Sequence, residues 1–238
     1  MVYSYYRNDW ADSLTADVMP VICGFLGGME YGAAGFDLEP FSRLGLLPSF
    51  TRSTLEDIVT GSHDGFAYTL CEARLARRTR SSRGKSKRKT VFRGLLIRIE
   101  LLEEVPSIYF ARERGVIGNW LSEKLSSLQD ESLLLETPFP DFEAVYEAYT
   151  RDPEGARDFI TPEFTQGMLR VAEEVTGKSR YVAAASEGRD FYLALPRKGD
   201  FLSLGSLFRP LALAEDDLHQ CIADLALPRR VIDTLRGM

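Results

Sequence analysis

The sequence predicts an α+β fold, in which helices pack on a mainly antiparallel sheet. Asp64-Gly65 lies between two apolar segments and is typical of a β-hairpin turn, where both positions need positive φ. Helical stripes occur at residues 161–177 and 216–235, without a regular β-α-β alternation. The chain has 238 residues, 45% of them hydrophobic, so we expect one domain over residues 1–238 with a full core.

Residues 1–50 are predicted to form a helical N-terminal segment. Apolar residues of 9–26 recur at helical spacing, and we expect Pro20 to kink or split this helix. A second, short helix is predicted from Asp37, as its cap, to the break at Pro48.

Residues 55–112 are predicted to be the β-rich half of the domain. The expected strands are, in order, 57–63, an outgoing strand from Phe66, 90–102 and 107–112. In the outgoing strand, Phe66, Tyr68 and Leu70 are expected to share one face. In the third strand, alternating apolar residues are expected to share one face, with Arg93 interrupting them: Val91, Leu95, Ile97, Ile99 and Leu101.

Residues 113–238 are predicted to be an α+β half that ends in helices. The expected elements are, in order, a helix over 117–128, strands at 131–136 and 142–150, a helix over 161–177, a hairpin over 180–196 with its turn at 187–189, and final helices over 216–235. Thr161 is the clearest helix start, because threonine caps and Pro162 suits the first turn.

The residues that usually carry catalysis are few and widely spaced. The histidines, His63 and His219, and the cysteines, Cys23, Cys71 and Cys221, do not have zinc-ligand spacing. We expect the thiols to be buried, and His63 to lie at the hairpin turn, too far from Cys71 for a catalytic pair. We therefore predict no catalytic residue, no metal site and no cofactor, and we favour a protein that is not an enzyme.

One segment has a strongly biased charge. Nine basic residues and no acidic residue occur from Arg74 to Lys89, which leaves 20 of the 29 basic residues against 35 acidic ones elsewhere. Residues 77–89 are predicted to be a basic loop between two strands, and its centre, residues 81–87, is expected to be mobile because it offers nothing apolar to bury. The candidate residues for binding an anion or an acidic partner are Arg77, Arg78, Arg80, Arg83, Lys85, Lys87, Arg88 and Lys89.

A basic loop on an acidic protein favours an anionic partner. An anionic membrane surface or an acidic protein face fits this charge, while the missing aromatic side chains argue against nucleic acid. A loop that only keeps the hairpin ends soluble and blocks edge pairing is the alternative. The odd cysteine count and the polar N-terminus predict a cytoplasmic protein, or one peripheral to the inner membrane.

Three stretches of the chain resemble a bacterial family known as domain of unknown function 3137. The first runs from Gly61-Ser62-His63 through Glu72 and a basic spacer to Val91-Phe92-Arg93-Gly94-Leu95, the second from Phe142 through Tyr149 and Ala156-Arg157 to Phe164, and the third from Phe191-Tyr192-Leu193-Ala194 to the closing helices. The resemblance spans most of residues 55–236. It implies no catalytic residue, and it implies a membrane setting because many members carry hydrophobic helices before this domain.

The leading hypothesis is a non-enzymatic binding or scaffold module that acts near the cytoplasmic membrane face through its basic loop. The alternatives are a small-molecule-binding domain or enzyme with an unrecognised pocket, and a weak nucleic-acid binder.

Overall fold

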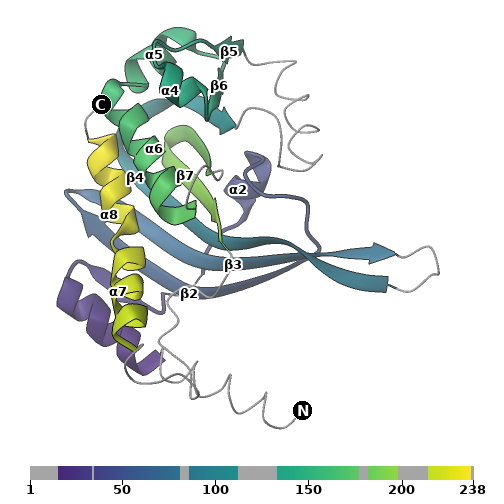
Figure 1. Ribbon diagram of the computed structural model, residues 1–238, viewed down its shortest axis with the longest axis vertical. Coiled ribbons are helices and arrows are strands. Elements are labelled where there is room, and N and C mark those ends of the chain that lie inside the picture. Colours follow the sequence, from purple (N-terminus) through teal and green to yellow (C-terminus); the bar gives the residue numbers. More distant parts are fainter. Residues whose placement is uncertain are drawn as a thin grey trace.

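The computed structural model describes residues 16–33, 35–80, 86–111, 133–176, 182–197 and 214–236. Most of the described helices cover one side of a long, twisted antiparallel sheet, and two strands project from it as a ribbon (Figure 1). The predicted α+β class with an antiparallel sheet is confirmed. The predicted helix over 117–128 lies outside the described residues.

The sheet contains seven described strands, and every pairing is antiparallel. They are β1 (Met29–Tyr31), β2 (Arg52–His63), β3 (Phe66–Arg80), β4 (Ser86–Ala111), β5 (Leu133–Leu135), β6 (Glu147–Thr150) and β7 (Ala183–Pro196). The strand order is β1-β2-β3-β4-β6-β5, and β7 also pairs with β4. Asp64 and Gly65 connect β2 to β3 with φ of 50° and 89°, which confirms the predicted turn.

Strand β4 is the central strand of the sheet and pairs with three other strands. It pairs with β3 over residues 86–100, with β6 over 108–111 and with β7 over 94–110. The prediction of two separate strands at 90–102 and 107–112 is therefore wrong. Register shifts against β7 on both sides of Val105 bend the strand without ending it.

The predicted hairpin over 180–196 is also wrong, because β7 is one strand. Its two halves do not pair with each other; both pair with β4. Gly188, with φ of 60°, lies where the strand bends. Arg189 donates hydrogen bonds from its guanidinium to the carbonyl oxygens of Leu101 and Leu102, and these bonds hold the bend against β4.

The helices follow most of the predicted boundaries. Residues 16–26 are helical, and the named helices are α2 (Glu39–Arg43), α4 (Pro140–Glu143), α5 (Pro153–Phe159), α6 (Pro162–Thr176), α7 (Ala214–Leu225) and α8 (Leu227–Leu235). The Thr161 cap is confirmed, because its Oγ1 accepts a hydrogen bond from the Phe164 backbone N–H at 3.2 Å.

Two helix and strand predictions need correction. The first helix does not split at Pro20, since the missing proline N–H removes only one backbone hydrogen bond. The predicted strand over 142–150 is a strand only over Glu147–Thr150, in β6. Its first two residues belong to helix α4, because Pro140 suits the first turn of a helix.

Side chains from the two faces of the sheet enter two separate cores. The larger core lies under residues 16–26, α5, α6, α7 and α8, and it includes Tyr68, Leu70 and Leu95. The smaller core lies on the opposite face under α2 and its flanking residues. Phe66 joins the larger core, as predicted, but Val91 packs on the smaller one because the register of β3 and β4 shifts there.

Gly94 is a position where β4 and β7 approach too closely for any side chain. A Cβ atom there would lie 2.0 Å from the carbonyl oxygen of Leu195. We expect Gly94→Ala to lower the free energy of unfolding by about 3 kcal/mol, because the ladder must open to admit the methyl group. Urea denaturation measures this loss.

Gly24→Ala is the matched control, because a Cβ atom at Gly24 would meet nothing within 4 Å. This substitution lies in a helix and is expected to raise stability by up to about 1 kcal/mol. Equal effects of the two substitutions would contradict the close β4–β7 contact.

Candidate anion-binding arm

The basic segment forms a two-stranded ribbon that extends beyond the rest of the sheet. Residues 77–80 of β3 pair with residues 86–89 of β4, and we call these residues the arm. The last pairing of β2 with β3 is at Ala76, and β7 begins to pair with β4 at Gly94. The arm is therefore flanked by no other described strand (Figure 1).

The prediction of a basic loop over residues 77–89 is wrong at both ends of that range. Eight of its positions are paired strand residues, and residues 81–85 lie outside the described part of the chain. The prediction was wrong because the segment has the composition of a loop. A ribbon whose two faces are both exposed to solvent does not need alternating apolar and polar residues. Its strands continue the hydrogen-bonded ladder of a buried sheet.

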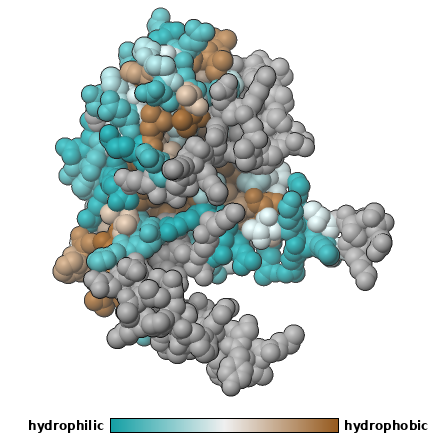
Figure 2. Space-filling model, in the orientation of Figure 1, coloured by the Kyte–Doolittle hydropathy of each residue, from teal (hydrophilic) through white to brown (hydrophobic). Residues whose placement is uncertain are grey.

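The pairing distributes the charge over both faces of the arm. Arg77 lies opposite Lys89 and both are exposed, and on the other face Arg78 lies opposite Arg88, again with both exposed. Lys87 is exposed opposite Thr79. In Figure 2 the described part of the arm shows mostly hydrophilic side chains.

These five cations lack a counter-charge within the part of the chain that the structure describes. No carboxylate of the described residues forms an ion pair with Arg77, Arg78, Lys87, Arg88 or Lys89. Like charges directly opposite each other destabilise a strand pair. The arm therefore holds a charge arrangement that an external anion would stabilise.

Two side-chain contacts support the ladder in spite of the repulsion. The Nε of Arg78 donates to Oγ of Ser86 at 2.6 Å. The hydroxyl of Thr79 donates to the Lys87 carbonyl oxygen at 3.2 Å. The root of the arm is anchored by Leu75 and Phe92, which are buried in the smaller core.

The other predicted binding residues are placed only in part. Arg80 is the last residue of β3 and pairs with Ser86. Arg83 and Lys85 lie outside the described residues. The structure thus brings five of the eight predicted side chains together on one short ribbon.

A polar cluster that was not predicted from the sequence lies at the opposite end of the sheet. Nε2 of His63 lies 2.9 Å from Oδ1 of Asp233, so the β2–β3 turn contacts α8. Asp64, in the same turn, accepts a hydrogen bond from Arg236. His63 was predicted at the turn, but no sequence signal linked it to a helix 170 residues away.

Within the described residues, this cluster is the one group of side chains that could together hold a metal ion. Ligand atoms of His63, Asp64 and Asp233 lie within 4.8 Å of one another. The guanidinium of Arg236 already neutralises Asp64, and the Asp233 carboxylate is engaged by the imidazole. We interpret the cluster as a structural contact that holds the β2–β3 turn against α8.

The cysteines behave as core residues. All three are buried and free, as predicted. Burial raises the pKa of Cys71 and of Cys221 to about 12, and it also raises that of Cys23. These thiols remain protonated at neutral pH, so they lack the thiolate that a nucleophile or metal ligand needs.

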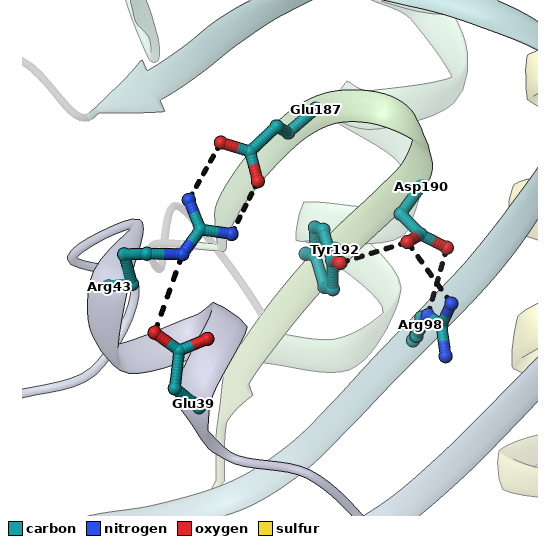
Figure 3. A network of polar contacts seen from close by, with 6 residues as sticks. All are labelled: Glu39, Arg43, Arg98, Glu187, Asp190 and Tyr192. Atoms are coloured by element: carbon teal, nitrogen blue, oxygen red, sulfur yellow. Dashed lines mark hydrogen bonds and ion pairs between the residues drawn. The ribbon is translucent and has the colours of Figure 1, made fainter.

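A further polar network fixes the bend of β7 (Figure 3). The guanidinium of Arg43 donates to both carboxylate oxygens of Glu187, at 2.7 and 2.5 Å, and also contacts Glu39 at 3.4 Å. Arg98 pairs in the same way with Asp190, at 2.8 and 3.1 Å. These carboxylates are engaged by arginines from other elements, which indicates a structural role.

Arg43 keeps Glu187 ionised. The hydrogen bonds from Arg43 lower the pKa of the Glu187 carboxyl, although desolvation opposes them. Because the folded pKa lies below the unfolded value, the stabilisation is present above the unfolded pKa and is lost as pH falls through the folded pKa. At neutral pH it is discounted to about 1 kcal/mol, since both side chains are partly exposed.

We therefore expect Arg43→Gln to lower Tm by about 2–4 °C at pH 7, and by much less at pH 3. Thermal melts monitored by circular dichroism at the two pH values measure the difference. Glu39→Gln is the control, because it removes only the exposed contact within α2. A loss of Tm that is equal at both pH values would contradict the role of the Glu187 charge.

Comparisons with known proteins give one family match. One solved structure that the chain resembles is the mycobacterial trehalose monomycolate transport factor A, with 13% identity, 87% of each chain covered and a TM-score of 0.42. Comparison with curated proteins gives no match. No helix within the described residues is both long and apolar enough to span a bilayer. A family model described as "Protein of unknown function (DUF3137)" matches residues 90–236, and the chain belongs to that family.

Proposed function

We propose that this protein is a non-enzymatic binding module that attaches to an anionic membrane surface through its arm. The observation that carries the proposal is the group of five exposed cations on both faces of a projecting ribbon, without carboxylate partners among the described residues. The membrane setting implied by the family resemblance supports the choice of partner.

The shape of the arm favours an approach tip first. Four ladder positions extend by about 10–13 Å at the usual rise of a strand. The headgroup layer on each side of a bilayer is about 5–7 Å thick. A ribbon that enters this layer by its tip brings the cations of both faces near lipid phosphates, whereas a ribbon lying flat uses one face.

The charge of the whole chain sets the strength and the direction of attachment. Each basic residue near an anionic membrane contributes about 1 kcal/mol, so the five described cations supply about 5 kcal/mol. This energy supports reversible, salt-sensitive binding. The rest of the chain is acidic, so an anionic membrane surface repels the rest of the chain while it attracts the arm.

The chemistry of the described residues supports binding over catalysis. Two cysteines are unsuited to act as nucleophiles, because burial raises the pKa of Cys71 and Cys221 to about 12 and keeps both thiols protonated at neutral pH.

Neutralising the arm is the direct test. We expect a variant with five substitutions on the arm to lose co-sedimentation with vesicles that contain about 30–40% anionic lipid. The substitutions are Arg77→Gln, Arg78→Gln, Lys87→Gln, Arg88→Gln and Lys89→Gln. The parent protein is expected to bind these vesicles at low salt, to release them as salt rises, and to ignore neutral vesicles.

Single substitutions provide the charge-matched control. Arg88→Gln on the arm and Arg157→Gln on α5 change the net charge equally, and both side chains are exposed. Only Arg88→Gln should weaken vesicle binding. Equal weakening would assign the binding to net charge, and arm-dependent binding to duplex DNA without vesicle binding would replace the membrane proposal with a nucleic-acid one.

A further inference from the structure

We propose that the groove between α6 and α8 binds a small phosphate monoester that carries a free hydroxyl group. The groove has a volume of about 220 Å³ and is lined by Gly167, Arg170, Val171, Arg230, Asp233 and Thr234. It lies on the helical side of the molecule, away from the projecting arm (Figure 1). The proposal is therefore independent of the membrane function.

The floor of the groove is fixed by a close contact of the two helices. A Cβ atom on Gly167 would lie 2.0 Å from Cγ2 of Thr234, so glycine permits an approach that any other residue would prevent. The Thr234 hydroxyl donates to the Arg230 carbonyl oxygen at 3.0 Å, which sets the rotamer of this side chain. The groove walls are thus held before a ligand arrives.

Two guanidinium groups line this groove. Arg170 is exposed and forms no ion pair or hydrogen bond with any part of the chain that the structure describes. Arg230 is held by a hydrogen bond from its Nη2 to the Ala223 carbonyl oxygen, at 2.9 Å. Guanidinium groups match the geometry of phosphate oxygens, so the pair favours a phosphate group as ligand.

Asp233 determines what the rest of the ligand must offer. It is the single carboxylate among the groove-lining residues, and its Oδ1 is already engaged by His63 at 2.9 Å. A second anionic group on the ligand would be repelled there. A ligand hydroxyl would instead donate a hydrogen bond to this carboxylate, so a phosphate that faces Arg170 and a hydroxyl that faces Asp233 complement the groove.

The volume limits the size of the ligand. At about 220 Å³ the groove is small, and it is partly open to solvent. Pockets for drug-sized ligands usually begin near about 300 Å³. A phosphorylated polyol of a few carbons fits this space, whereas a dinucleotide does not.

Isothermal titration calorimetry with glycerol 3-phosphate tests the site. The full chain with the five arm substitutions is the background, so that the arm does not bind the anion. We expect saturable 1:1 binding, weakened by at least about tenfold in Arg170→Gln and unchanged in Arg157→Gln. Asp233→Asn should weaken glycerol 3-phosphate but not inorganic phosphate, and glycerol alone should not bind.

Three results would overturn the proposal. They are no saturable binding of glycerol 3-phosphate to the background protein, equal affinity in Arg170→Gln and Arg157→Gln, and binding that requires the unsubstituted arm. Circular dichroism of each variant confirms that it is folded. Vesicle binding by the parent protein does not depend on any of these results, so the two proposals fail separately.

Discussion

The pairing of β4 with its neighbours is the interaction on which the rest of the structure depends. This strand of 26 residues contacts β3, β6 and β7, and its two faces contribute to both cores. Because β4 bends at the register shifts around Val105 and does not end there, the helices on one face and α2 on the other are positioned by a single element. The close approach at Gly94 is part of this arrangement.

The same strand gives the arm its geometry. The ladder that is buried at Leu95 and Ile97 continues past the core into solvent, where its side chains become cations. A flexible loop would present the same charges at variable spacing, and an anionic surface would have to order it. A ribbon presents them already ordered, which reduces the entropy cost of binding. The cost is the repulsion between like charges across the ladder.

The extent to which the fold was predictable varied with how local the signals were. The Asp64-Gly65 turn and the Thr161 cap were predicted correctly, since their causes lie within four residues. The continuity of β4 and β7 was missed, because the predicted break between 102 and 107 and the predicted turn at 187–189 both lie inside single strands. Only the partner strand shows that these residues are accommodated as bends.

The candidate sites show the same limit. The basic residues of the arm were found from composition, but their ladder could not be, because it is imposed by the sheet beyond Leu75. The groove joins Arg170 of α6 to Arg230 and Asp233 of α8, and its contact with His63 comes from the other end of the chain. Such contacts depend on tertiary packing, which leaves no pattern in the spacing of these residues.

Amide hydrogen exchange of the free protein, measured by NMR, tests most directly whether the arm is an ordered ribbon. The inward-pointing amides of residues 77–79 and 87–89 should exchange at least about tenfold more slowly than those of an unstructured peptide. Their protection should increase with salt, which screens the repulsion across the ladder. Exchange at the rate of an unstructured chain, at both low and physiological salt, would contradict an ordered ribbon and would indicate that the basic residues lie on a flexible loop.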